Sequence, residues 1–122
     1  MNRNLKTFSN YVFNNYGTKT ILGKSTFGLN SLNSNSVLHN IIIYPPYQRN
    51  GLGTTLLRNT ENLITKHYPY VETIQLYAWQ SYQYNVSDFF IKNGYQFDTS
   101  KAVFTYDDQD IIYELYPMIK NL

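Results

Sequence analysis

The stretch from Asn40 to Tyr68 constrains the fold more than any other part of the chain. It reads NIIIY, then PPYQRNGLG, then TTLLRNTENLITKHY. The apolar first piece is typical of a buried strand, and Pro45 and Pro46 end it because proline cannot donate to a sheet ladder. Apolar residues then recur at helical spacing from Leu52 to Ile64, which predicts an amphipathic helix. The chain therefore contains a strand that turns through a glycine-containing loop into a helix.

The loop in front of this helix has the chemistry of an anion site. The first N–H groups of a helix have no partner within the helix, and the helix dipole adds partial positive charge there. Gly51 and Gly53 let the backbone come close to a ligand, because no Cβ stands in the way. Phosphate is the usual guest of such a site, and a purely structural turn is the alternative. A Walker loop is excluded, because Thr54 and Thr55 follow the second glycine where Lys and Ser or Thr would be needed.

The remaining patterns predict a single α+β domain over residues 1–122. Residues 3–16 suit either a helix or a strand. Alternating and β-branched residues predict strands elsewhere, and the sequence Asn93-Gly94 would supply the left-handed cap of a short helix. Strands are expected over Lys19–Leu29, Val37–Tyr44, Glu72–Trp79, Lys101–Tyr106 and Ile111–Ile119, and the short helix over Asn85–Tyr95. The first two and the last two strands would form antiparallel hairpins, the last around Asp107–Asp110.

Composition excludes several classes of site. The chain has no cysteine, so disulfides, cysteine zinc sites and a cysteine nucleophile are excluded. His39 and His67 lie far apart without an acidic partner at ligand spacing, so no metal is expected. A formal net charge of +2, with scattered Lys and Arg, argues against nucleic acid as a partner. No apolar run has the length of a membrane span or a signal-peptide core. We therefore expect a soluble cytoplasmic protein without a membrane partner.

The stretch IIIYPPYQRNGLGTTLL, which runs from Ile41 to Leu57, resembles the acetyl-CoA signature of the Gcn5-related N-acetyltransferase family. In that family a strand, often a proline and an aromatic residue precede Gln/Arg-x-x-Gly-x-Gly/Ala, which opens a helix. Gln48, Gly51 and Gly53 match this signature position for position. The resemblance implies that the predicted anion loop is an acetyl-CoA loop.

Two further pieces support the resemblance. FFIKNGY, from Phe89 to Tyr95, is similar to the family's Phe-Tyr-Glu-Lys-Asn-Gly-Phe element, and the tail YDDQDIIYELYPMIKNL is similar to its closing hairpin. The resemblance covers roughly Val37 to Leu122. It implies a mixed, largely antiparallel sheet with splayed central strands and flanking helices. The part before Val37 is shorter than in the family, which usually places three strands and two helices there.

The resemblance implies how acetyl-CoA would be held. Two central strands, Val37–Tyr44 and Glu72–Ala78, would splay apart and admit the pantetheine arm as though it were an extra strand. The N–H of Ile41 would bond the thioester carbonyl and support the developing oxyanion, and the Ile43 backbone would pair with the pantetheine amides. The pyrophosphate would sit on the amides of the loop, which are those of Gln48, Arg49, Asn50, Gly51, Leu52, Gly53 and Thr54.

The general acid does not follow from the resemblance. Many members of the family protonate the leaving thiolate with a tyrosine on the last helix, and the matching residue here is Phe90, which cannot donate a proton. Tyr84 and Tyr82 precede it by one or two helical turns and could substitute. With thirteen tyrosines in the chain, a chance position near the site is the alternative explanation.

His39 is the candidate general base. The acceptor amine must be neutral to attack, so a group must take its proton, directly or through water. Two-residue alternation along the strand places His39 on the same face as Ile41 and Ile43. A hydrogen-bonded structural histidine is the alternative, and Glu72 and Glu114 are weaker candidates for the base.

The function expected from the residues and the resemblance is acetyl-CoA-dependent transfer of an acetyl group directly to a primary amine. The alternatives are a catalytically inactive acyl-CoA-binding or interaction module on the same fold, and an α+β domain that binds nucleotide phosphates. The short N-terminal part would leave the acceptor site open or completed by a second chain, so a homodimer is expected. The acceptor stays open between small amines, peptide N-termini and lysine side chains.

Overall fold

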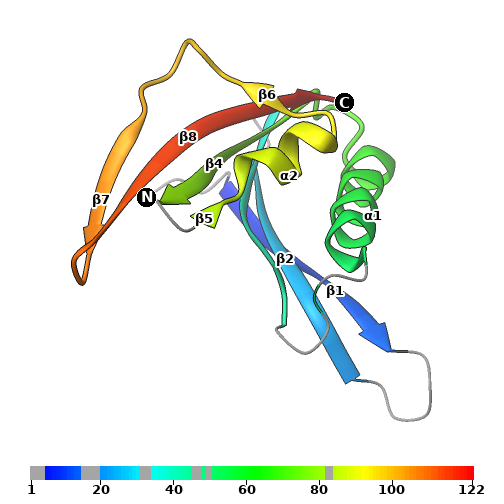
Figure 1. Ribbon diagram of the computed structural model, residues 1–122. Helices are drawn as coiled ribbons and strands as arrows, with labels where there is room; N and C mark the ends of the chain where they lie inside the picture. Colours follow the sequence, from blue (N-terminus) through cyan, green and yellow to red (C-terminus); the bar gives the residue numbers. More distant parts are fainter. Residues whose placement is uncertain (1–4, 15–19, 31–33, 45–47, 49–50, 82–83) are drawn as a thin grey trace.

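The computed structural model describes residues 5–14, 20–30, 34–44, 48, 51–81 and 84–122. They form a mixed α+β fold, as predicted (Figure 1). The elements in chain order are β1 (Leu5–Asn14), β2 (Thr20–Asn30), β3 (Asn35–Ile43), α1 (Leu52–His67), β4 (Thr73–Ser81), β5 (Tyr84–Asn85), α2 (Ser87–Lys92), β6 (Gln96–Phe97), β7 (Phe104–Asp108) and β8 (Ile111–Asn121).

The strands form one sheet in the order β1-β2-β3-β4-β8-β6, with β5 added to β4 and β7 added to β8. Every pairing is antiparallel except that between β3 and β4. The long strand β8 pairs with β4 over most of its length and also carries β6 and β7. The predicted largely antiparallel sheet is therefore confirmed.

Strands β3 and β4 splay apart. They pair over only three residues each, from Asn35 opposite Thr73 to Val37 opposite Gln75. Beyond Val37 no ladder joins them, although β3 continues to Ile43 and β4 to Ser81. The sheet thus consists of two parts, which we call the first leaf (β1, β2 and β3) and the second leaf (β4 to β8, without the helix). The splay predicted for the central strands is confirmed.

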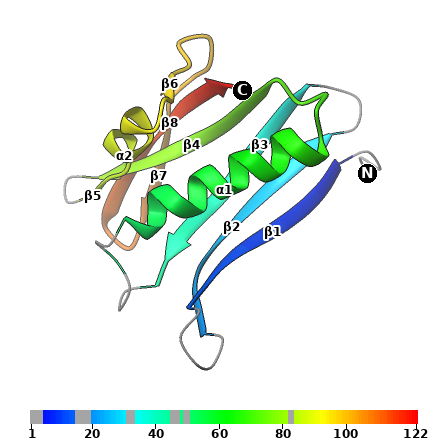
Figure 2. The ribbon, with the colours of Figure 1, turned by 90° about the vertical axis from the view of Figure 1, so that its right-hand side faces the viewer.

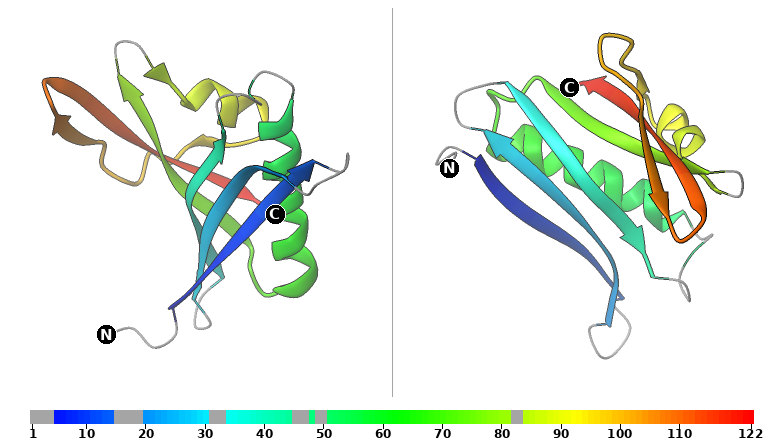
Figure 3. Two further views of the ribbon diagram at one scale, coloured as in Figure 1. Left: turned by 90° about the horizontal axis from the view of Figure 1, so that it is seen from below. Right: turned by 90° about the vertical axis from the view of Figure 1, so that its left-hand side faces the viewer.

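The two helices cover one face of the sheet. Figure 2 shows α1 in front of the first leaf, and Figure 3 (right) shows it behind the sheet from the other side. Leu57 and Ile64 of α1 and Phe90 of α2 belong to one buried apolar cluster with the inward residues of the strands. The opposite face, which we call the bare face, carries no helix in the described part of the chain and exposes Tyr77 and Trp79 of β4.

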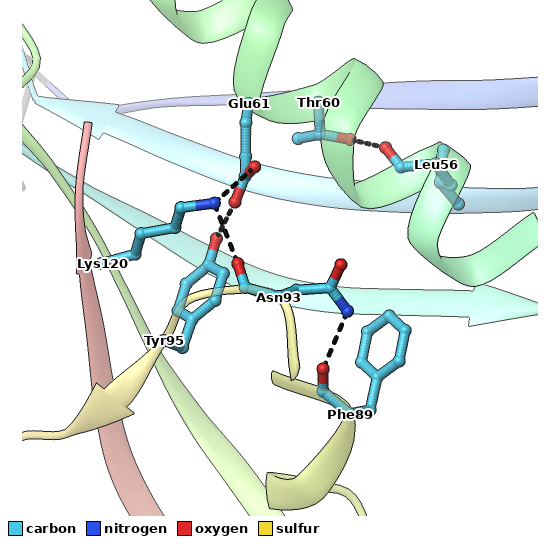
Figure 4. Close-up of polar contacts among 7 residues, drawn as sticks. All are labelled: Leu56, Thr60, Glu61, Phe89, Asn93, Tyr95 and Lys120. Atoms are coloured by element: carbon cyan, nitrogen blue, oxygen red, sulfur yellow. Dashed lines mark hydrogen bonds and ion pairs between the residues drawn. The ribbon is translucent and has the colours of Figure 1, made fainter. Parts of the chain in front are cut away.

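A buried polar group joins α1 to the second leaf (Figure 4). Glu61 of α1 is only 7% exposed. One of its carboxylate oxygens lies 3.0 Å from Lys120 Nζ of β8, and the other accepts a hydrogen bond of 2.8 Å from the Tyr95 hydroxyl. Lys120 also donates to the Asn93 carbonyl oxygen at 2.9 Å. Burial, followed by the Glu61 carboxylate, raises the pKa of Tyr95 well above its ordinary value.

Several local predictions can be compared with the observed elements. The ambiguous N-terminal segment is the strand β1. The left-handed cap after α2 is confirmed, because Gly94 has φ +92°. The final hairpin is confirmed, although its turn is shorter than predicted and consists of Gln109 and Asp110 between paired Asp108 and Ile111. Two short strands, β5 and β6, were not predicted.

Candidate functional site

A cleft of about 1110 Å³ opens where β3 and β4 separate. It passes through the sheet, since Ile41 and Phe90 reach it from the helix side while Tyr77 and Trp79 lie on the bare face. The described residues that line it are Leu38, His39, Asn40, Ile41 and Ile42 of β3, Leu76, Tyr77, Trp79 and Ser81 of β4, Val86 and Phe90 at α2, and Asp108, Asp110, Ile111, Ile112 and Tyr113 of the β7–β8 hairpin.

His39 is the extra residue of a β-bulge on β3. Thr26 of β2 pairs with Asn40 and the next residue, Phe27, pairs with Leu38, so His39 has no partner of its own in the ladder. A bulge bends its strand and interrupts the alternation of side chains. The bulge lies immediately beyond the point at which β3 and β4 stop pairing, so it coincides with the start of the splay.

The predicted face of His39 is wrong, because the bulge changes the alternation. A Cβ added to Gly28 would lie 2.8 Å from His39 Nε2, so the imidazole lies against this glycine. Gly28 stands between two residues that point into the core, Phe27 and Leu29, and therefore faces the opposite side of the sheet. Ile41, in contrast, packs against the core. His39 thus lines the cleft from the bare face.

The backbone of Ile41 and Ile43 faces the gap between the leaves. The N–H of Tyr44 donates to the Leu22 carbonyl oxygen of β2 at 2.9 Å. In an antiparallel pair, residues alternate between those that bond the neighbouring strand and those that point away from it. Ile43 and Ile41, one and three residues before Tyr44, therefore direct their N–H and C=O groups away from β2, toward β4. These are the groups predicted to meet the pantetheine arm.

Helix α1 begins with groups suited to an anion. Gly51 precedes it in the left-handed conformation, with φ +74°, which favours glycine. No side chain caps this end, and the first turn contains no acidic residue. A Cβ on Gly51 would meet nothing within 4 Å, so the space in front of the helix is open. The first helical bond comes from the Thr55 N–H to the Gly51 carbonyl oxygen, so the N–H groups of Leu52, Gly53 and Thr54 precede it.

The two ends of the loop differ in how they contact the rest of the protein. Gly53 packs closely on α2, since a Cβ there would lie 3.3 Å from the Phe89 ring. Gln48 turns back toward β3, and its side-chain amide donates to the Ile43 carbonyl oxygen at 2.8 Å. One backbone acceptor on the gap side of β3 is therefore occupied by the loop itself. Arg49 and Asn50 lie outside the described residues.

The candidates for proton transfer other than His39 are less favourably placed. Phe90 is buried and lines the cleft, but it has no proton to donate. Tyr84 pairs through its backbone with Ser81, whereas its side chain, like all of Tyr82, lies outside the described residues. Glu72 and Glu114 do not line the cleft.

Sequence reasoning missed the aromatic wall of the cleft. Tyr77, Trp79 and Tyr113 were interpreted only as strand residues. Alternation along β4 gives a signal, because Leu76 and Ala78 are buried and the residues between and after them must face the other side. The sequence does not indicate that these residues lie on the face of the sheet that carries no helix in the described residues.

The part of the chain that the structure describes contains no cluster of three or more His, Cys, Asp or Glu side chains suited to a metal. None of its helices combines the length and the apolar character needed to cross a bilayer.

Comparison with known proteins gives matches in structure alone. No protein-family model and no curated protein matches the sequence. An acetyltransferase from Bacillus cereus superposes with a TM-score of 0.72 at 19% identity, over 97% of this chain and 74% of that one. The ribosomal-protein-S18-alanine N-acetyltransferase from Escherichia coli gives 0.72 at 18% identity, over 99% and 71%. The PaiA N-acetyltransferase from Thermoplasma acidophilum, in complex with coenzyme A, gives 0.67 at 20% identity, over 95% and 61%.

These similarities establish the fold. The chain has the mixed α+β fold of the Gcn5-related N-acetyltransferases, with a mostly antiparallel sheet and helices on it. It spans 74% of the Bacillus cereus protein and 61% of the Thermoplasma acidophilum protein. The described elements before β3 are the two strands β1 and β2.

Proposed function

We propose that this protein is an acetyl-CoA-dependent N-acetyltransferase that transfers the acetyl group directly to a primary amine. The observation that carries the proposal is the opening through the sheet between β3 and β4, which is bordered by free strand edge and lies beside an uncapped helix start. Structural neighbours that are N-acetyltransferases, one of them in complex with coenzyme A, support it.

Acetyl-CoA would lie along β3 from the start of α1 into the gap. Its pyrophosphate would take the N–H groups of the loop from Gln48 to Thr54, which includes Arg49 and Asn50. The backbone of Ile43 would pair with the pantetheine arm, and the side-chain amide of Gln48 would have to leave the Ile43 carbonyl oxygen if that acceptor is used. The Ile41 N–H would bond the thioester carbonyl and stabilise the negative charge that develops on its oxygen.

The acceptor would enter from the bare face. His39 lies on that side of the cleft and would take a proton from the incoming ammonium, directly or through one water. The neutral amine then attacks the thioester carbon, the carbon–sulfur bond breaks, and the thiolate takes up a proton. We propose Tyr84 as the donor of that proton, because Phe90 cannot supply it.

A non-catalytic acyl-CoA-binding module is the second candidate. Two observations favour it, namely the phenylalanine at position 90 and the absence of a helix from the bare face of the described residues. It shares the acetyl-CoA site and lacks turnover. A panel of primary amines, assayed for release of free coenzyme A thiol, separates the two candidates.

The acetyl-CoA site is tested by calorimetry on Gly51→Val. We expect the variant to lose acetyl-CoA binding, because the branched side chain would fill the open space before α1 that the pyrophosphate needs. The change also forces a side chain into φ +74°, at a cost of roughly 1–2 kcal/mol in folding stability.

Gly94→Val is the matched control. It imposes a similar backbone strain, at φ +92°, at the end of α2 and away from the loop. It should be destabilised at least as much, because a Cβ there would also lie 3.3 Å from Lys120 Cε, and still bind acetyl-CoA. Undiminished affinity in folded Gly51→Val would contradict the site. If wild-type protein were stabilised by ATP and not by acetyl-CoA, it would be a nucleotide-phosphate-binding domain instead.

A further inference from the structure

We propose that the acceptor of this protein carries a second cationic group, held on the bare face by Trp79, Tyr113 and the carboxylates of Asp108 and Asp110. This inference rests on the proposed function for the identity of the bound molecule as the acceptor. Its evidence is a part of the cleft that the acetyl-CoA contacts do not use. All four residues line the cleft, and none of them lies on β3 or the loop.

The aromatic part of this wall is held in place by two tyrosines of the β7–β8 hairpin, which pair with each other across the strands. The Trp79 indole makes edge contacts with Tyr106 and Tyr113, with ring centroids 5.5 Å and 5.4 Å apart. Trp79 is nevertheless 40% exposed, so part of its ring is open to the cleft. A fixed and partly exposed indole attracts cations through its ring electrons, and tryptophan is the strongest of the side chains that do so.

The acidic part of the wall is the tip of the β7–β8 hairpin. Gln109 and Asp110, at φ 48° and 68°, form a two-residue turn that places Asp108 and Asp110 on the cleft. Neither carboxylate has a hydrogen bond or an ion pair within the described residues, and none of the described residues that line the cleft is Lys or Arg. The negative charge of the tip is therefore left for a ligand to neutralise.

The two sides of the cleft require different chemistry of one molecule. His39 and Ile41 line it from β3, where the amine would react, and Asp108 and Asp110 line it from the β7–β8 hairpin. Apolar side chains, including Ile112, line the cleft as well. An amine with one charge would leave the carboxylates unpaired. An acceptor with two amino groups and an apolar spacer satisfies both sides.

The first test uses binding alone. Trp79 is the only tryptophan of the chain, so intrinsic fluorescence reports on this wall. We expect 1,5-diaminopentane to change the fluorescence with a Kd about tenfold lower than that of n-pentylamine, which has the same carbon chain and one charge; tenfold corresponds to about 1.4 kcal/mol. Equal dissociation constants for the two amines would overturn the proposal.

Substitutions assign the preference to the tip. The double variant Asp108→Asn/Asp110→Asn keeps the turn, because asparagine tolerates positive φ, and it should bind both amines equally. Asp107→Asn is the matched control, because this residue has the same charge, lies in the same strand and does not line the cleft. The preference should survive in Asp107→Asn. A preference that persists in the double variant, or that Asp107→Asn also abolishes, would sink the assignment.

Turnover separates this inference from the proposed function. If the protein is an N-acetyltransferase, kcat/KM for 1,5-diaminopentane should exceed that for n-pentylamine by about the same tenfold. If both amines are acetylated equally well, the inference fails and the proposed function stands. If the fluorescence preference is present but neither amine is acetylated, the cation site stands and the transferase function fails.

Discussion

At the scale of single residues, His39 has the largest effect on the shape of the site. As the unpaired residue of the β3 bulge, it turns its own imidazole to the bare face while Leu38 and Ile41 still point into the core. A regular strand cannot place residues 38 and 41 on one face, because their separation is odd. The bulge therefore places the His39 imidazole on the bare face. The Ile41 N–H, which is the proposed thioester contact, lies on the edge of β3 that borders the gap.

We predict that His39→Gln lowers kcat by at least about 100-fold, the lower end of what a positioned base contributes. Glutamine keeps hydrogen-bonding groups at this position but cannot take up a proton. Acetyl-CoA affinity should change little, because the proposed cofactor contacts are backbone groups. Measuring kcat checks the first point, and a calorimetric titration with acetyl-CoA checks the second. Full turnover in His39→Gln would show that His39 is structural and that solvent supplies the base.

The sequence could not reveal the face of His39. Two-residue alternation is a reliable rule only while each residue has a partner in the ladder, and the bulge is decided by how β2 and β3 pair. Glu61 is a similar case. As an acidic residue on a helix it is expected at the surface, and its partner Lys120 lies 59 positions away in the chain.

At the scale of elements, Glu61, Tyr95 and Lys120 form the polar connection between α1 and the second leaf (Figure 4). Tyr95 holds its proton more tightly in the folded protein than in the unfolded chain, because burial and the Glu61 carboxylate raise its pKa above 10.0. The stabilisation is therefore fully present below pH 10. It is lost as the pH rises further, by about 1.4 kcal/mol per pH unit for one proton.

We predict that Tyr95→Phe lowers the free energy of unfolding by about 2 kcal/mol at pH 8, because a buried hydrogen bond to a charged group is lost. The difference between wild type and variant should shrink above pH 10. Urea unfolding at pH 8 and near pH 11 measures it. Tyr70→Phe, at a tyrosine that is 43% exposed, is the control and should change little at either pH. If the free energies of unfolding of wild type and Tyr95→Phe differ equally at pH 8 and near pH 11, this account is contradicted.

The elements differ in how far the sequence predicts them. The path from β3 through the loop to α1 is predictable, because prolines, glycines and a helical apolar pattern act locally. The cap at Gly94 and the β7–β8 hairpin are predictable for the same reason. Strands β5 and β6 have two residues each and exist through pairing with β4 and β8, so no local pattern marks them. The aromatic wall also depends on which face the helices leave open.

At the scale of the whole molecule, one edge of the sheet favours a homodimer. Strand β1 is the outermost strand of the described sheet over ten residues, and such an edge is a template for another strand. We predict a mass close to twice the 14.4 kDa of the chain by light scattering at micromolar concentration. A mass near that of one chain would count against the dimer, and hydrogen exchange of the β1 amides would show whether this edge is covered.

The narrow connection between the two leaves has a consequence for the life of the protein in a cell. Three residue pairs join β3 to β4, so the unliganded sheet lacks the backbone bonds that a closed sheet would have. A pantetheine arm in the gap would supply such bonds to the folded state alone. Acetyl-CoA at 100 times its Kd would then add about 2.7 kcal/mol to the folding free energy. Proteases act on the open form of a chain, so under the proposed function the abundance of this protein would follow the supply of acetyl-CoA.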